Sequence, residues 1–373
     1  MNILVAINIA FAVLYSAFTL WLYKGWYRLP RISCKKPPDY TTTFFSILVP
    51  FRNEGKQLPG FLAGIKKLRY PIKQFELIFI DDESNDFSVD IIKKNLSGSS
   101  ITYQILQSEG GKKQALSLGL ERAKADFVIT LDADIQIKTG LLECYHQSFS
   151  NSSFKLIAGP VHFRSKSIME KMFSLEFLSL IVSGAAGIYN QKPIMLNAAN
   201  LGFEKAVALE FQEKVYQSDT ASGDDVFLLE AILEKYGPKA IGFMKTSEAI
   251  VFTNPPANLD LFINQRVRWA SKSTKYKNHF AQAVAVFILA FNILILTNLG
   301  MLIFKGDYSG VALLFGLKLV LDFKLLLSGS RFMQDKKLMW YYIPVQLLYP
   351  FYITIIGLMS MIRPYRWKGR RIH

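Results

Sequence analysis

Three acidic pairs have the residue types and the spacing for metal-assisted and acid–base chemistry. They occupy positions 81–82, 132–134 and 224–225. On an extended segment, residues two apart face the same side, so Asp132 and Asp134 can both reach one site. Two like charges there are costly without a cation, and a hard divalent ion with oxygen ligands offsets that cost. We therefore expect Mg²⁺ or Mn²⁺ at this pair.

Two further segments supply cationic groups. Lys112 follows Gly110 and Gly111, and glycines let a backbone approach a phosphate closely while the lysine adds a charged donor. The alternative is a solvated lysine at an ordinary helix start. Residues 265–269 read Gln-Arg-Val-Arg-Trp, and in a helix the first and fourth share one face, with the tryptophan on the adjoining side. The alternative here is an interfacial tryptophan–arginine pair ahead of a membrane helix.

The elements that must position these residues follow from the hydrophobic pattern. From residue 44 to residue 277, short β-branched runs alternate with helical stretches, as an α/β, Rossmann-like parallel sheet requires. The expected strands are Phe45–Val49, Glu76–Ile80, Thr102–Leu106, Phe127–Leu131 and Lys155–Pro160. Such sheets bind ligands at the carboxyl ends of their strands, and the acidic motifs fall at those ends.

Four motifs in a fixed order resemble those of family 2 glycosyltransferases of the membrane-bound branch, which includes cellulose, chitin and hyaluronan synthases and ceramide glucosyltransferase. The motifs are Asp81-Asp82, Asp132-Ala133-Asp134, Gly223-Asp224-Asp225 and Gln265-Arg266-Val267-Arg268-Trp269. The resemblance covers about residues 44–275. It implies a GT-A fold, that is, a Rossmann-like nucleotide-diphospho-sugar transferase domain, flanked by transmembrane helices. It also implies inverting, metal-dependent transfer from a UDP-sugar.

The resemblance assigns the catalytic and metal roles. Asp225 is the expected catalytic base, which takes the proton from the acceptor hydroxyl as that oxygen attacks the anomeric carbon. Asp224 stands where the family has a glutamate, so its role stays open between catalysis and capping of the following helix. In the family, the residue that matches Asp134 ligates the metal, and the one that matches Asp132 contacts either the ribose or the metal.

The resemblance also gives a donor-binding set. Either Asp81 or Asp82 accepts a hydrogen bond from the uracil N3–H, while Ser84, Asn85 or Asp86 can cap the next helix. The second arginine of the last motif meets the diphosphate, and its tryptophan lines the acceptor pocket. The donor-side positions are Pro50, Arg52, Glu54, Asp81, Asp82, Lys112, Asp132, Gln265, Arg268 and Trp269.

The acceptor is less specified by the residues. Asn197 and Asn200 lie in a segment that resembles the acceptor-side loop of lipid-modifying relatives, and they can bind acceptor hydroxyls or make turn hydrogen bonds. Trp269 is the third acceptor-side residue. A lipid presented at the membrane is the first expectation, because the chain has few membrane helices and one short catalytic domain. A processive polysaccharide synthase and a non-catalytic membrane scaffold are the alternatives.

The two ends of the chain carry an excess of apolar residues. Apolar residues make up 51% of the 373, and the net charge is +15, with basic residues beside the apolar runs. This placement fits an anionic membrane surface, and no motif supports a nucleic-acid partner. We expect an anchor at 1–25, a basic, proline-containing linker at 26–43, a cytosolic catalytic domain at 44–277 and a membrane region with a basic tail at 278–373. A helix at 168–182 is expected on the membrane surface, a core-facing helix being the alternative.

Three apolar segments are expected in the C-terminal region, at 280–304, 309–327 and 338–362. Within the second, Lys318 and Asp322 are one turn apart and can pair. Four full crossings would place the basic tail outside, against the positive-inside rule, so either the last segment is a re-entrant hairpin or the rule fails. A homo-oligomer or a membrane partner protein would be needed if these few helices formed a polymer channel.

The cysteines and histidines give no sign of a metal site. Cys34 and Cys144 have no partner at metal-site spacing, and a disulfide framework is not expected, which indicates a reducing compartment. The four histidines are scattered along the sequence, and this argues against zinc.

Overall fold

The computed structural model describes residues 3–34, 43–216, 223–271, 277–362, 365–367 and 370–372. The chain forms two compact units, and each is described by itself. The helical unit comprises Met1–Leu29, Ser165–Ile194 and Pro255–His373, and the sheet unit comprises Pro30–Arg164 and Met195–Asn254. The sequence places 168–182 and 255–277 within the catalytic domain, but the structure groups them with the flanking helices.

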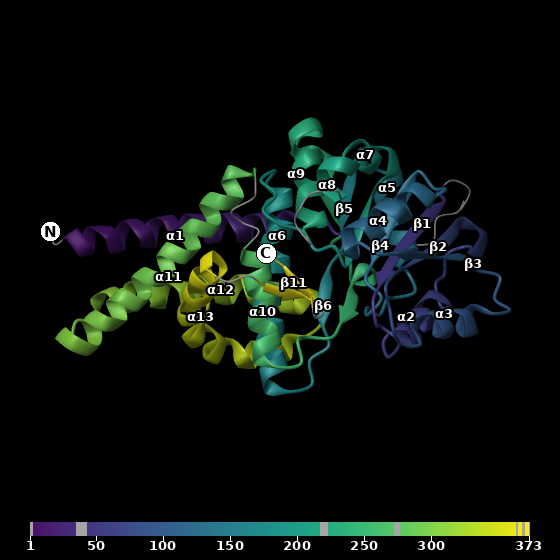
Figure 1. Ribbon diagram of the computed structural model, residues 1–373. Helices are drawn as coiled ribbons and strands as arrows, with labels where there is room; N and C mark the ends of the chain where they lie inside the picture. Colours follow the sequence, from purple (N-terminus) through teal and green to yellow (C-terminus); the bar gives the residue numbers. More distant parts are fainter. Residues whose placement is uncertain are drawn as a thin grey trace. The chain divides into compact units, whose positions relative to one another are not determined.

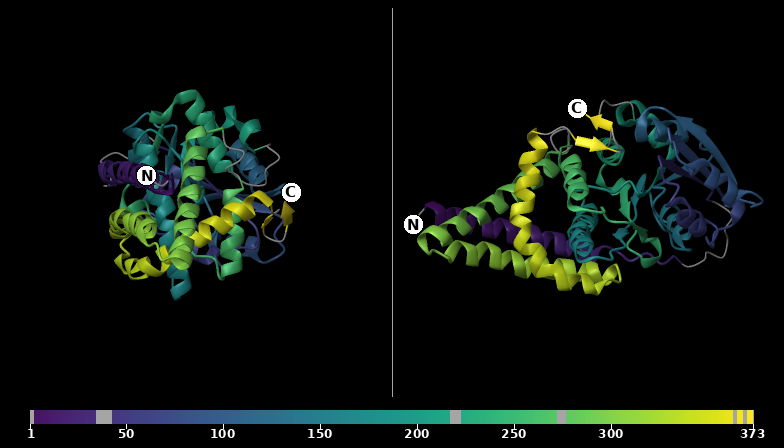
Figure 2. Two further views of the ribbon diagram at one scale, coloured as in Figure 1. Left: turned by 90° about the vertical axis from the view of Figure 1, so that its left-hand side faces the viewer. Right: turned by 60° about the horizontal axis from the view of Figure 1, so that its bottom comes forward.

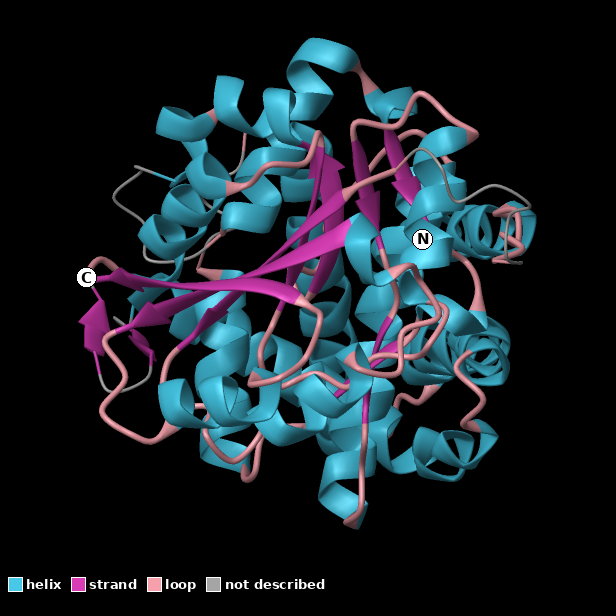
Figure 3. Ribbon diagram, turned by 90° about the vertical axis from the view of Figure 1, so that its right-hand side faces the viewer, coloured by secondary structure: helices cyan, strands magenta, loops and turns pink. Residues whose placement is uncertain are grey.

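Four parallel strands form the first half of the central sheet. They are β1 (Phe45–Phe51), β2 (Phe75–Asp82), β3 (Thr102–Ser108) and β4 (Phe127–Leu131), in the order β3-β2-β1-β4. The chain winds outward from β1 to β3 and then crosses back to β4. Right-handed crossovers place α2 (Leu58–Ile65) and α3 (Ser88–Leu96) on one face and α4 (Gly111–Arg122) on the other. Helices therefore cover both faces of the sheet (Figure 3), and the point where the order reverses lies between β1 and β4.

The second half of the sheet is mixed. β7 (Asn200–Glu204) runs antiparallel between β4 and β5 (Leu156–Ala158), and β8 (Ile241–Phe243) pairs in parallel with β5. β6 (Val161–Phe163) pairs with β9 (Val251–Thr253) in a separate two-stranded sheet. The remaining helices of this unit are α5 (Leu141–Ser150), α7 (Lys205–Glu210), α8 (Gln212–Tyr216) and α9 (Asp224–Tyr236). The predicted α/β class with a parallel-dominated sheet is confirmed.

All five predicted strands are present, but β7 was not predicted. Its sequence, Asn-Leu-Gly-Phe-Glu, contains residues that are poor strand formers, and burial rather than propensity makes it a strand. A Cβ at Gly202 would lie 2.4 Å from Cε1 of Tyr145, so only glycine lets the aromatic ring of α5 pack against the strand.

The helical unit contains α1 (Ile3–Arg28), α6 (Ile168–Tyr189), α10 (Leu259–Ala270), α11 (His279–Lys305), α12 (Ser309–Phe332) and α13 (Tyr342–Ile362). Within the described residues, four segments are long and apolar enough to cross a membrane: Ile3–Arg28, Ile168–Tyr189, His279–Lys305 and Lys336–Met361. The 309–327 segment forms a helix but is not one of these four, since it carries three charged residues. The helix expected at 168–182 begins where predicted and extends to Tyr189.

Paired polar groups join the helices of this unit. Asn8 on α1 and Asn298 on α11 exchange two hydrogen bonds, of 2.9 and 3.0 Å, and α1, α11 and α12 lie side by side near this pair (Figures 1 and 2). The predicted ion pair between Lys318 and Asp322 is present on α12. Gln346 of α13 also accepts from the Lys318 ammonium at 2.7 Å, so the charge that Asp322 balances is hydrogen-bonded to a second helix as well.

One prediction about the cysteines is wrong. Cys34 and Cys144 form a disulfide within the sheet unit, joining the segment after α1 to α5. The two residues are 110 positions apart, and the intervening chain contains β1 to β4. No spacing signal reveals such a pairing, because the fold brings the two cysteines together. Cysteine usage therefore no longer supports a reducing compartment.

Reduction of this disulfide is expected to destabilise the sheet unit by about 2–4 kcal/mol, since the bond closes a loop of more than a hundred residues in the unfolded chain. Thermal unfolding in detergent, with and without a reductant, measures the effect. The Cys34→Ser, Cys144→Ser double variant should unfold at the lower temperature in both conditions. Alkylation of both cysteines in native, unreduced protein would contradict the disulfide.

Candidate functional site

The two acidic residues that end β2 have different partners. The Asp82 Oδ1 accepts a hydrogen bond of 2.8 Å from the backbone N–H of Gly111, the first residue of α4. Its Oδ2 lies 3.9 Å from Nη1 of Arg52, which follows β1. Asp81 instead accepts from the N–H of Ser84 at 2.9 Å. Both carboxylates are buried, and only Asp82 joins the loops after β1 and β3.

A third carboxylate, Asp86, lies just before Phe87, the N-cap residue of α3. Asp86 Oδ1 accepts from the Ser88 N–H at 3.0 Å, and its Oδ2 accepts from the Gly55 N–H at 3.0 Å. The Ser88 hydroxyl in turn accepts from the N–H of Glu54 at 3.0 Å. Asp86 therefore stabilises the start of α3, and the pair at 81–82 is not needed for capping. Pro50 lies within β1, opposite Ile80 of β2.

Lys112 lies at the centre of a cluster of carboxylates in the sheet unit. Its Nζ donates to Asp132 Oδ1 at 2.6 Å. Burial lowers the pKa of Lys112, but the charges of Asp132, Asp224 and Asp225 outweigh it and raise the pKa above its ordinary value. One hydrogen bond thus joins two motifs that lie apart in the sequence, and the charges of a third act on the same lysine. Three carboxylates act on this one lysine, so their negative charge exceeds its positive charge, and a further cation would be attracted to the cluster.

The two aspartates of the third motif are the first two residues of α9. Gly223 precedes them with φ of 109°, a left-handed conformation that favours glycine, and this turn starts the helix. The positive end of the helix dipole stabilises ionised carboxylates at these positions. Asp225 Oδ1 accepts from the Val226 N–H at 2.9 Å. Burial and the charge of Asp224 raise the pKa of Tyr216.

Asp134 is held by a residue that sequence reasoning missed. The hydroxyl of Thr253, in β9, donates to Asp134 Oδ2 at 2.9 Å. Two backbone hydrogen bonds between Gln136 and Phe252, of 2.6 and 2.9 Å, fix β9 beside this segment. Thr253 and Asp134 are 119 positions apart, so the sequence offers no signal for their hydrogen bond. Thr253 orients one of the two expected metal ligands.

The carboxylates of Asp132 and Asp134 fit a divalent ion that is only partly held by protein. In the described part of the chain, no three His, Cys, Asp or Glu side chains are grouped closely enough to hold a metal alone. Mg²⁺ is commonly bound by one or two carboxylates together with substrate phosphates. The donor set is therefore of the kind that a nucleotide diphosphate completes.

The residues expected on the acceptor side differ in exposure. Asn197 Oδ1 accepts from the Ala199 N–H at 2.9 Å, which is a turn hydrogen bond. Asn200 is fully buried, donates to the carbonyls of Pro160 and Ala249, and accepts from the Tyr145 hydroxyl. Its environment favours the structural alternative.

The last motif lies in the helical unit, on α10. Gln265 accepts a hydrogen bond from the neighbouring Arg266, whose guanidinium lies 4.4 Å from the centre of the Trp269 ring. Arg268 is in the last turn of the same helix. The motifs at 81–82, 132–134 and 223–225 thus lie in the sheet unit, whereas the motif at 265–269 lies in the helical unit.

Comparisons with known proteins bear on these motifs. Residues 46–203 match the family model described as glycosyl transferase family 2. The undecaprenyl-phosphate 4-deoxy-4-formamido-L-arabinose transferase of Pseudomonas savastanoi is 38% identical over 103 residues, which cover 26% of this chain and 30% of that protein. The poly-beta-1,6-N-acetyl-D-glucosamine synthase of Staphylococcus aureus is 26% identical over 255 residues, which cover 64% of this chain and 58% of that protein. The chain thus spans less than two thirds of the length of either relative.

Among solved structures, the fold is similar to that of a mannosyltransferase from Pyrobaculum calidifontis, determined in complex with GDP-Man and Mn²⁺. The TM-score is 0.58 at 16% identity, over 96% of this chain and 99% of that one. At this identity the likeness concerns the fold alone. The predicted GT-A fold is confirmed by it.

Proposed function

Since the chain carries a family 2 glycosyltransferase domain with a GT-A fold, we propose that it transfers a sugar, with inversion, from a UDP-sugar to a membrane-associated lipid. The observation that carries this proposal is the cluster of Lys112 with Asp132, Asp224 and Asp225. A cation and a carboxylate base at one site are what the departure of a diphosphate and the activation of a hydroxyl require.

In this proposal, Asp225 is the general base. Its carboxylate takes the proton of the acceptor hydroxyl. An electron pair of that oxygen then forms the new bond to the anomeric carbon, while the bond from this carbon to the nucleotide diphosphate breaks and the diphosphate departs. Asp224, next to it and mostly buried, keeps the local charge negative. Lys112 donates to the diphosphate when the donor is bound, and this contact replaces its hydrogen bond to Asp132. Asp81 or Asp82 binds the base.

A divalent ion at Asp132 and Asp134 would stabilise the negative charge that develops on the leaving diphosphate. The Pyrobaculum enzyme of similar fold was solved with Mn²⁺, which supports this choice of cofactor. Thr253 holds Asp134 in the orientation that a ligand needs. On the α10 side, Arg268 is proposed to meet the diphosphate, and Gln265 and Trp269 to contact the donor and the acceptor.

The lipid acceptor is favoured by the relatives and by the helices. One curated relative is named as an undecaprenyl-phosphate transferase, and four segments of this chain can span a membrane by length and composition. We therefore propose an integral membrane protein. The basic residues beside the apolar runs favour a sheet unit on the cytosolic side, and the Cys34–Cys144 disulfide counts against that side. A polysaccharide synthase is the second candidate, because the other relative is named as a polymer synthase and aligns over more of the chain.

Nucleotide release in detergent tests the function. Purified protein is incubated with a panel of UDP-sugars and with GDP-mannose, in Mn²⁺ or Mg²⁺, with a lipid extract as acceptor. We expect turnover of one UDP-sugar and a lipid heavier by one sugar unit in the mass spectrum. A polymer product would favour the synthase, and turnover of GDP-mannose alone would overturn the donor assignment. Absence of turnover with every donor and acceptor would favour a scaffold.

A further inference from the structure

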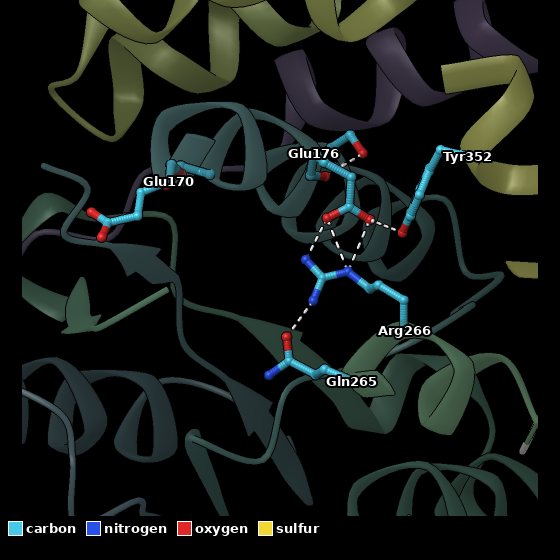
Figure 4. Close-up of polar contacts among 7 residues, drawn as sticks. Glu170, Glu176, Gln265, Arg266 and Tyr352 are labelled. Atoms are coloured by element: carbon cyan, nitrogen blue, oxygen red, sulfur yellow. Dashed lines mark hydrogen bonds and ion pairs between the residues drawn. The ribbon is translucent and has the colours of Figure 1, made fainter. Parts of the chain in front are cut away.

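A buried arginine occupies the second position of the Gln-Arg-Val-Arg-Trp motif. The Nε of Arg266 donates to both carboxylate oxygens of Glu176 on α6, at 3.1 and 3.0 Å, and its Nη2 donates to Oε2 of the same residue (Figure 4). Its Nη1 donates to the side-chain oxygen of Gln265. One guanidinium thus joins the motif glutamine to a carboxylate on another helix.

The same guanidinium lies between two aromatic rings of α10. It is 4.5 Å from the centre of the Phe262 ring and 4.4 Å from that of Trp269. These residues are one helical turn before and one turn after Arg266, so the plane of the guanidinium restricts the rotamer of the tryptophan. The position of Trp269 therefore depends on how Arg266 is held.

A third helix completes the contact. The hydroxyl of Tyr352 on α13 donates to Glu176 Oε1 at 3.0 Å, and its ring lies 5.5 Å from that of Phe262 (Figure 4). Pro350 lies two residues earlier, inside the same helix. The carboxylate of Glu176 is thereby shared between α10 and the C-terminal helix.

This ion pair gives orientation more than stability. The Arg266 side chain is 3% exposed and that of Glu176 is 8% exposed, and removal of two charges from water offsets most of their attraction. A bidentate arginine–carboxylate contact, however, is satisfied in only one relative orientation of the two groups. Burial lowers the pKa of Arg266, but Glu176 raises it by more, so the guanidinium stays charged.

We infer that Glu176, Arg266 and Tyr352 are positioning residues, which fix Gln265 and Trp269 for the sugar transfer and make the C-terminal helix α13 part of that machinery. The inference rests on the proposed function, which assigns Gln265 and Trp269 to the donor and acceptor. The three residues touch neither substrate. They act through the orientation of α10.

The experiment compares two tyrosines of the same helix. Tyr352→Phe removes the hydroxyl that meets Glu176, and Tyr342→Phe removes one that donates to the Leu319 carbonyl at 2.6 Å. For Tyr352→Phe we expect kcat/KM to fall about 10-fold, as for one hydrogen bond to a charged group, at a melting temperature lowered no more than that of Tyr342→Phe. Amide exchange in residues 259–270 should be faster by a similar factor. Tyr342→Phe should change neither.

A second pair of variants separates positioning from general loss of packing. Glu176→Gln leaves the Arg266 charge buried without its counter-ion, and Asp322→Asn does the same to Lys318 on α12. Glu176→Gln should speed exchange in α10 and lower kcat/KM more than Tyr352→Phe does. Asp322→Asn should leave α10 exchange unchanged. Equal effects of the two variants would overturn the positioning role.

Exchange also separates this inference from the proposed function. If the wild-type protein turns over no donor, the function fails, and exchange in α10 alone decides whether Tyr352 and Glu176 hold that helix. If the wild type is active and Tyr352→Phe matches Tyr342→Phe in exchange and in kcat/KM, only the positioning inference fails.

Discussion

Replacement of Asp225 by asparagine is expected to lower kcat by about 10²–10⁴-fold, because an amide cannot accept the proton of the attacking hydroxyl. The side chain keeps its shape and its place in the first turn of α9, so the fold should be retained. KM for the donor should change little, since the lost step is proton transfer. Steady-state kinetics of nucleotide release, beside the melting temperature, measures both quantities.

A glutamate on the same helix provides the matched control. Glu234 pairs with Lys214 at 2.7 Å and its side chain is 64% exposed, so Glu234→Gln loses one surface ion pair of small energetic weight. Its kcat should equal that of the wild type. If Asp225→Asn keeps more than about a tenth of the wild-type kcat, the base is another residue, and the neighbouring Asp224 is then the first to test.

Chelation of divalent ions is expected to reduce turnover at least about 100-fold, and Asp134→Asn should do so even at saturating Mn²⁺. The reason is charge: without a divalent cation, the diphosphate would approach the carboxylates of Asp132, Asp134, Asp224 and Asp225, and Lys112 already pairs with one of them. The dependence of rate on Mn²⁺ concentration, for the wild type and the variant, measures the effect.

The Thr253→Val variant tests the metal site more mildly than Asp134→Asn does. It removes the hydroxyl that holds Asp134 and leaves both carboxylates in place. Loss of such an orienting contact typically weakens metal binding by about 10–100-fold, so the required Mn²⁺ concentration should rise while the maximal rate is largely kept. Full activity in the presence of a strong chelator would exclude a metal role for the pair.

The sheet could be predicted because its pattern is local. Short apolar, β-branched runs such as Phe127–Leu131 form strands; the last four residues of this one are buried, and the structure has the strand at the predicted bounds. Since the carboxyl ends of parallel strands share one edge, the meeting of Lys112 with Asp132 followed from the fold class. The charge of Asp225, which helps to raise the pKa of Lys112, fits the same arrangement.

The contacts that could not be predicted depend on tertiary packing. β7 packs against Tyr145 because Gly202 has no Cβ, and three of its five residues, Asn, Gly and Glu, are poor strand formers. The Cys34–Cys144 disulfide joins residues that only the finished fold brings together. The resemblance gave Arg266 no role, and only the fold brings Glu176 beside it.

Because the Gly111 N–H bonds to Asp82, one carboxylate would serve two parts of the proposed nucleotide site. It ties the end of β2 to the first residue of α4, and Lys112 is the next residue along that helix. A lower rate in a variant at position 82 would therefore have one source in the freed start of α4 and, if Asp82 is the residue that binds uracil, a second in the lost contact with uracil. Preference between UDP- and GDP-sugars has one source, since a displaced lysine weakens both diphosphates alike. Donor preference is thus the quantity that assigns uracil recognition to Asp81 or to Asp82.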